Sequence, residues 1–245
     1  MAIAERIMAG RAVLLASLLA ASTCVADAAQ PIVGIVYSPS LDAACVAPRG
    51  GKVEQKWKSE LASRIGEFKA LWQAEGPELI KATEAVTGKS FPSRHFTARL
   101  TLCKIPSQSD FHGAIIINMR YALKSYTAQP VPMRYKVDTL FHELLHKFLE
   151  AHPVTNSALL RQHAAEPPRV RDHLHLLALE KAVLLRLHRT KELKNIVVID
   201  SRLAGGYYKR TWNIVNATDT SGCHMCYDLP REVGSTHSAS ALVRP

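Results

Sequence analysis

A stretch of about 18 residues, from Met133 to Glu150, constrains the fold of this chain more than any other segment. Its apolar residues recur at intervals of three and four, which is the spacing of a helix that buries one face. Pro132 precedes the stretch and Pro153 follows it, as expected near helix boundaries. The same stretch carries the sequence H-E-x-x-H at positions 142–146. The fold must therefore bury a helix that holds two histidines and a glutamate.

This spacing of histidine and glutamate is suited to metal chemistry. Residues four apart on a helix share one face, so the imidazoles of His142 and His146 can reach a single metal ion. Glu143 lies to the side, where it can take a proton from an attacking water and pass it to a leaving amine. The alternative is a pair of core histidines satisfied by ordinary hydrogen bonds. The otherwise apolar helix in a secreted chain favours the metal site.

Residues 139–148 resemble the zinc-binding helix of the zincin metallopeptidases. Thr139 and Leu140 before the motif and Phe148 after it fit the extended family pattern, whereas Lys147 stands at a position that is usually uncharged. The resemblance implies a zincin-like fold of the α+β class, in which a small, mostly antiparallel sheet packs on the active-site helix and on a second ligand-bearing helix. It also implies Zn²⁺ as the cofactor.

A catalytic zinc site needs a third protein ligand and keeps one position for water. His152 lies six residues after His146, which is the spacing of the metzincins. Leu149, however, stands where that family has the glycine of a sharp turn. His152 is therefore one candidate among several.

A helix expected from about Val170 to Arg189 offers two further candidates. His173 and Glu180 fall in the middle of its apolar arc, where polar groups are costly unless a metal or a partner satisfies them. They could also pair with each other or with arginine side chains. Because gluzincins take their third ligand from a downstream helix, the resemblance implies Glu180 as ligand and His173 as a catalytic group. The reverse assignment stays open, and His175 is expected on the solvated face.

The remaining pattern predicts a small sheet and several helices. Alternation of apolar and polar residues predicts a strand at 96–102, and a β-branched run predicts another at 113–119. A short polar loop joins them, so an antiparallel pair is expected, and the second strand stands where zincins bind an extended peptide. Helices that follow a strand pair indicate the α+β class. Other expected elements are an extended segment at 31–51 with a strand at 32–37, two helices within 53–87 separated at Gly76-Pro77, a strand at 196–199 and a helix at 207–215.

Residues 1–28 have the features of a secretory signal peptide. Arg6 and Arg11 precede an apolar run at 12–21, and small residues surround a cleavage site after Ala28. The apolar run is about half the length that spans a bilayer, so no stable membrane insertion is expected after cleavage. A periplasmic or secreted protein is predicted, with one domain at 29–230 and a flexible tail at 231–245.

Composition adds two expectations. The formal net charge is +10, but the basic residues are scattered along the chain, which indicates a solvated surface and no nucleic-acid partner. In an oxidising compartment the cysteines of the mature chain should form disulfides, and four cysteines allow three pairings. A first hypothesis joins Cys45 to Cys103 and Cys223 to Cys226.

The sequence therefore predicts a secreted or periplasmic zinc metallopeptidase that hydrolyses a peptide or protein substrate. The alternative is a non-catalytic secreted binding or scaffold protein with a zincin-like fold, whose metal is absent or structural. A structural site could be closed by four ligands, namely His142, His146, His173 and Glu180. Three residues without a spacing rule are candidates for an electrophilic donor, although packing or surface placement is the favoured explanation of each: Tyr207, Tyr208 and His224. The sequence specifies neither the substrate nor the oligomeric state.

Overall fold

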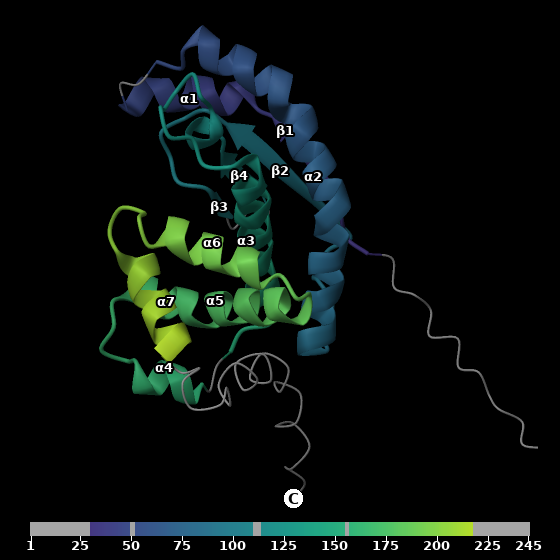
Figure 1. Cartoon of the computed structure of the whole chain (residues 1–245), viewed down its shortest axis with the longest axis vertical. Helices are drawn as coiled ribbons and strands as arrows, with labels where there is room; N and C mark the ends of the chain where they lie inside the picture. Colours follow the sequence, from purple (N-terminus) through teal and green to yellow (C-terminus); the bar gives the residue numbers. More distant parts are fainter. Residues whose placement is uncertain (1–29, 50–51, 110–113, 155–156, 218–245) are drawn as a thin grey trace, which may run out of the picture.

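The computed structural model describes residues 30–49, 52–109, 114–154 and 157–217 (Figure 1). The predicted signal peptide and the tail at 231–245 lie outside these residues. Within them the chain forms an α+β structure with a four-stranded sheet. The strands are β1 (Ile32–Tyr37), β2 (His95–Thr101), β3 (Gln108–Ser109) and β4 (Ala114–Asn118). The helices are α1 (Pro39–Arg49), α2 (Gln55–Thr87), α3 (Met133–Ala151), α4 (Ala158–Gln162), α5 (Pro168–Arg186), α6 (Thr190–Asp200) and α7 (Tyr207–Ala217).

The sheet is mixed, with the strand order β1-β2-β4-β3. β1 pairs with β2 in parallel and β2 pairs with β4 in parallel, whereas β3 is antiparallel to β4. The expected antiparallel pair and the mostly antiparallel sheet are therefore wrong. The loop after β2 is not a simple hairpin, because β3 forms within it and turns the chain back before β4 begins. β4 consequently lies inside the sheet, and β3 forms its edge.

α2 is one continuous helix, although Gly76 and Pro77 were expected to divide it. A proline inside a helix removes one backbone hydrogen bond and costs roughly 3 kcal/mol. Pro77 is exposed, and large side chains are buried on both sides of it, including those of Trp72 and Leu79. Burying each such side chain contributes about 1.5–3 kcal/mol, so packing outweighs the local break.

Two segments differ from their expected secondary structure. Residues 196–199 belong to α6 and do not form a strand, because Leu193, Ile196 and Asp200 are buried at helical spacing. Residues 39–49 form α1 within the segment expected to be extended. The carboxylate of Asp42 on α1 accepts hydrogen bonds from the Thr101 hydroxyl at 2.6 Å and from the Leu102 amide at 2.8 Å, which ties α1 to the sheet.

The expected helices at 133–150, 170–189 and 207–215 are confirmed as α3, α5 and α7, with small shifts of their ends. In Figure 1 the sheet lies at one end of the molecule, α5, α6 and α7 gather at the other, and α3 runs between them. α3 contacts β3, β4, α2 and α5, so it connects the two parts. None of the helices in the described part of the chain has the length and apolarity that crossing a bilayer requires.

Cys103 lies just after β2, is fully buried and is disulfide-bonded. The side chains of Cys45, Cys223 and Cys226 lie outside the part of the chain whose side chains are described. The pairing of the four cysteines therefore stays a prediction.

Candidate metal centre

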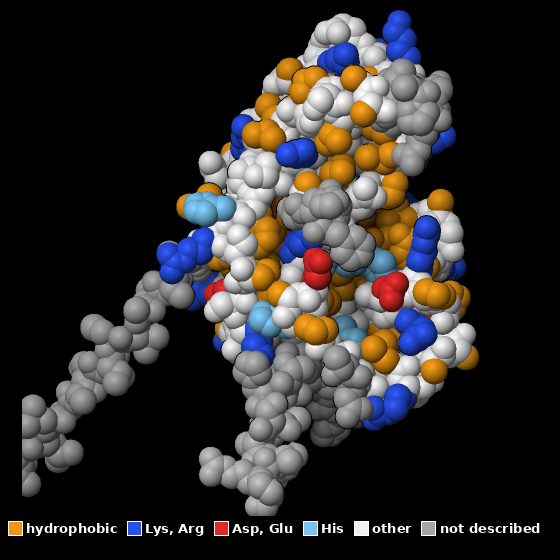
Figure 2. Space-filling view, turned by 180° about the vertical axis from the view of Figure 1, so that it is seen from behind, with side chains coloured by type: hydrophobic (Ala, Val, Ile, Leu, Met, Phe, Trp, Pro, Cys, Tyr) orange, Lys and Arg blue, Asp and Glu red, His pale blue; other side chains and the backbone are white. Residues whose placement is uncertain are grey.

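Three histidines from two helices meet where α3 crosses α5. His142 and His146 come from α3 and His173 comes from α5, and one ring nitrogen of each lies within 4.8 Å of the others. Nitrogen ligands of one tetrahedral zinc lie about 3.4 Å apart when the Zn–N bonds are 2.0–2.1 Å long, so small side-chain rotations would bring all three onto one ion. Figure 2 shows histidine side chains near the middle of one face, among apolar side chains. The donor set and its spacing fit a zinc ion.

Hydrogen bonds to the Nδ1 atoms orient two of these imidazoles. His173 Nδ1 lies 2.7 Å from the carbonyl oxygen of Arg169, and His142 Nδ1 lies 3.2 Å from Glu180 Oε2. When Nδ1 carries the proton and donates to these oxygens, Nε2 keeps the lone pair that a metal needs. The two contacts thus favour Nε2 as the ligand atom in both rings.

Burial keeps the imidazoles in the form that binds metals. It is the largest cause of a lowered pKa in each ring, to about 3 for His142, about 2 for His146 and about 4 for His173. All three are therefore neutral near pH 7, and a neutral imidazole is the metal-ligating form.

Glu180 lies behind His142 and not among the three histidines. It is buried, and burial raises the pKa of its carboxyl, with a smaller contribution from the nearby charge of Asp200. The sequence leaves Glu180, His173 and His152 as alternative third ligands, and the structure brings His173 to the cluster. The choice depends on where α5 crosses α3, which helical periodicity does not define.

Glu143 is buried beside the cluster, where the edge strand reaches α3. Its carboxyl accepts a hydrogen bond from the backbone N–H of Ser109 in β3. Burial is the largest cause that raises its pKa, to about 8, and the charge of Glu180 adds to the effect. The site therefore combines three neutral imidazoles with a carboxyl group of raised basicity.

Two aromatic residues at the start of α7 cover the histidines. The Tyr208 hydroxyl lies 3.1 Å from His142 Nε2, and the Tyr207 ring centroid lies 5.3 Å from that of His173. Gly205 and Gly206 precede them with φ values of 89° and 68°, a conformation that glycine adopts freely. Of the three candidate donors, Tyr208 is the one whose hydroxyl reaches a histidine, and His224 lies outside the described residues.

Two other histidines lie away from the cluster. His152 ends α3 and its Nε2 lies 2.8 Å from the carbonyl oxygen of Ser90. His175 was expected in solvent but is buried, so this expectation is wrong. α5 packs against α2, α3 and α7, and therefore buries more than the single arc that its apolar residues indicated.

Comparisons with protein-family models, curated proteins and solved structures found no match for this chain. The resemblance of residues 139–148 to the zincin helix therefore stays local, and the chemistry has to be argued from the geometry of the site.

Proposed function

We propose that this protein is a zinc-dependent hydrolase that cleaves peptide bonds outside the cytoplasm. The observation that carries the proposal is the meeting of His142, His146 and His173 beside the buried Glu143. Three histidines from rigid helices form the donor set of a catalytic zinc and leave a fourth position for water or substrate. A bound zinc ion would lower the pKa of a water molecule and polarise the carbonyl of a substrate.

The chain's own residues supply the remaining chemistry. Glu143 takes the proton of the attacking water and then passes it to the leaving amine. The backbone N–H of Ser109 holds this carboxyl in place. The Tyr208 hydroxyl, beside His142, donates a hydrogen bond to the oxyanion that develops on the substrate. Glu180 orients His142 through Nδ1, and such outer partners support metal binding in many sites.

The proposal includes a zincin-like arrangement of the site. The helix with the H-E-x-x-H sequence packs against an edge strand that runs antiparallel to its neighbour. An extended peptide can add to such an edge by main-chain hydrogen bonds, which give affinity with little sequence preference. In this chain β3 takes the role expected for the strand at 113–119, because β4 lies inside the sheet.

The position of Glu180 separates the catalytic proposal from a structural site. A closed, non-catalytic zinc site would need a fourth protein ligand, and Glu180 was the candidate. Its carboxyl group instead contacts Nδ1 of His142, and Glu180 is not among the residues whose ligand atoms gather within 4.8 Å of one another. This placement favours an open coordination position, and with it the enzyme over the scaffold.

Replacing Glu143 by Gln tests the proposal. We expect Glu143→Gln to retain one zinc per chain while hydrolysis of a denatured protein falls at least about 100-fold, because general-base catalysis contributes roughly 10²–10⁴. Zinc content and cleavage rate are measured on the same sample. Glu150→Gln is the matched control, since Glu150 is an exposed residue of α3 paired with Lys147, and it should change neither value.

Two outcomes would contradict the proposal. Unchanged hydrolysis by Glu143→Gln removes this residue from the mechanism. The wild-type protein could also bind zinc but bind no hydroxamate and cleave no member of a peptide library. This result would support the non-catalytic scaffold protein, because a zinc ion with an open position binds such a chelator and a zinc ion with four protein ligands does not.

A further inference from the structure

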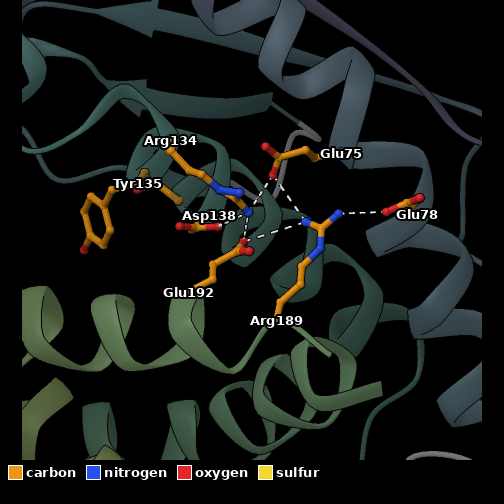
Figure 3. A network of polar contacts seen from close by, with 8 residues as sticks. Glu75, Glu78, Arg134, Tyr135, Asp138, Arg189 and Glu192 are labelled. Atoms are coloured by element: carbon orange, nitrogen blue, oxygen red, sulfur yellow. Dashed lines mark hydrogen bonds and ion pairs between the residues drawn. The ribbon is translucent and has the colours of Figure 1, made fainter. Parts of the chain in front are cut away.

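A cavity with a volume of about 440 Å³ lies between the start of α3, the α5–α6 turn and α6. It shares no residue with the histidine cluster. Part of its wall is apolar and is formed by Pro132, Ile196 and Ile199. The rest of the wall is polar, and the network of side chains drawn in Figure 3 forms much of it.

The carboxyl groups at this wall already have partners within the protein. Arg134 pairs with Glu75 at 2.6 Å and also with Glu192, so this guanidinium joins α2 and α6 (Figure 3). Asp138 and Glu192 share a hydrogen bond, which requires a proton between them, and burial together with this contact raises the pKa of Asp138. These acidic groups are therefore neutralised, and they do not require a cationic ligand.

The donors at the rim of the cavity have no such partners. The side chains of His188, Lys191 and Asn195 line the cavity. All three residues are exposed, and none of their side chains has a hydrogen bond or ion pair with another residue of the described ranges. A cavity whose carboxyl groups are held in ion pairs within the protein, and whose rim carries side-chain donors without a partner, is complementary to an acceptor. Its apolar wall adds a requirement for an apolar group on the same ligand.

His188 is held in an unusual backbone conformation at this rim. Its φ is 57°, and among the described residues it is the one non-glycine residue with positive φ. The backbone N–H of Arg189 donates a hydrogen bond to the carbonyl oxygen of Leu184 at 2.8 Å, and the N–H of His188 donates one to the carbonyl oxygen of Leu185 at 3.0 Å. This is a helix-ending pattern that favours glycine at the position of His188. An imidazole at a glycine position lowers stability, and such residues concentrate at functional sites.

We propose that this cavity binds a small organic anion, a carboxylate joined to an apolar group. Lys191 and His188 hold the carboxylate, Asn195 adds a hydrogen bond, and Ile196 with Ile199 contacts the apolar part. The ligand is a free carboxylic acid or the C-terminal carboxylate of a peptide, since both present the same group. The proposal does not depend on the zinc chemistry, because the two sites share no residue.

Titration with hexanoate tests the cavity, with hexanamide as the uncharged counterpart of the same shape. Binding is measured by calorimetry on the full chain, and chemical shifts of backbone amides locate it. We expect hexanoate to bind at least about tenfold more tightly than hexanamide and to shift the amides of residues 188–196. N-acetyl-leucyl-leucine and its C-terminal amide form the second arm. Tight binding of the peptide acid alone would identify a peptide end as the natural ligand class.

Matched variants connect the binding to the named residues. Lys191→Met should weaken hexanoate binding about tenfold, whereas Lys194→Met, on the same helix but outside the cavity, should leave it unchanged. His188→Gly should weaken binding while the melting temperature stays equal or rises. A histidine with only a structural role would not lower the affinity while leaving the melting temperature equal or higher.

Four results would overturn the proposal. Equal binding of hexanoate and hexanamide removes the carboxylate site, and so does the absence of binding of both hexanoate and the peptide acid at millimolar concentrations. Equal effects of Lys191→Met and Lys194→Met on hexanoate binding would show that the binding depends on the net charge of the protein and not on the cavity. Binding that requires zinc and disappears in His146→Ala would place the anion at the histidine cluster. Loss of hydrolysis in Glu143→Gln has no bearing on any of these outcomes.

Discussion

At the scale of single residues, His173 and Glu180 have different proposed roles: His173 binds the metal, and Glu180 orients the ligand His142. Zinc affinities of variants distinguish these roles. Glu180→Gln removes the carboxyl group that contacts Nδ1 of His142 and leaves only an amide oxygen as acceptor. We therefore expect zinc binding to weaken by roughly 10- to 100-fold, as for the residues that hydrogen-bond metal ligands in other sites. His173→Ala removes one of the three proposed ligands and should weaken zinc binding further. Competition with a chromophoric chelator measures both values. His152→Ala is the control, because this histidine lies at the far end of α3.

The opposite ranking would contradict the assignment of the ligands. If Glu180→Gln lost zinc more completely than His173→Ala, Glu180 would be the third ligand, as the gluzincin resemblance implies. The sequence left three candidates for the third ligand, namely His152 and these two residues, both of which fall on the apolar arc of one helix. The resemblance implied Glu180, but helical periodicity alone could not rank His173 and Glu180, since the ranking depends on the angle and height at which α5 crosses α3.

Lys136 is a second residue with a testable effect. Its ammonium group is buried in α3, and burial alone lowers its pKa to about 8. The unfolded chain then binds more protons than the folded chain between about pH 8 and 10.5, so stability rises with pH in this window. Below pH 8 the charged lysine costs on the order of 3 kcal/mol, because each pKa unit corresponds to about 1.4 kcal/mol.

We therefore expect Lys136→Met to be more stable than the wild type at pH 7 by about 1–3 kcal/mol, and to lose the rise in stability above pH 8. Urea unfolding at several pH values between about 6 and 10 measures both effects. Lys69→Met is the control, because Lys69 is exposed on α2. A destabilised Lys136→Met that keeps the wild-type pH profile would show that the lysine is solvated or paired.

At the scale of elements, two glycines of α2 should respond oppositely to alanine. A Cβ at Gly66 would meet no atom within 4 Å, so Gly66→Ala should stabilise the protein by about 0.5–1 kcal/mol through helix propensity. A Cβ at Gly76 would lie 2.5–2.8 Å from three ring atoms of the buried Trp72, so Gly76→Ala should destabilise it by about 1–3 kcal/mol. Thermal unfolding of the two variants tests the pair, and stabilisation by both would show that Trp72 moves freely.

The same helix shows what sequence patterns can and cannot predict about an element. Apolar spacing identified α2, α3, α5 and α7, because each buries side chains at intervals of three and four over many residues. Gly76 and Pro77 were interpreted as a break, although burial on both sides of them outweighs the local cost. The run at 196–199 is too short for its period to distinguish a strand from a helix, and only its contacts in the fold make it part of α6.

At the scale of the whole molecule, the topology of the sheet could not be predicted from the sequence. The strands at 96–102 and 113–119 were recognised from their composition, but their relative direction depends on β3, which has two residues. No periodic pattern marks so short a strand. The pairing of β3 with β4 nevertheless determines the site, because it places the Ser109 amide against Glu143. The H-E-x-x-H helix could be predicted from the sequence. Tyr207 and Tyr208 were candidates without a spacing rule, and their position over the histidines follows only from the fold.

A crystal structure of the zinc-loaded protein, with the ion located by its anomalous signal, tests the central claim most directly. We expect one zinc ion bound by Nε2 of His142, His146 and His173 at about 2.0–2.1 Å, with a solvent molecule in the fourth position. Glu180 should remain on Nδ1 of His142. A site without zinc, or a zinc ion that Glu180 coordinates as a fourth protein ligand, would contradict the account.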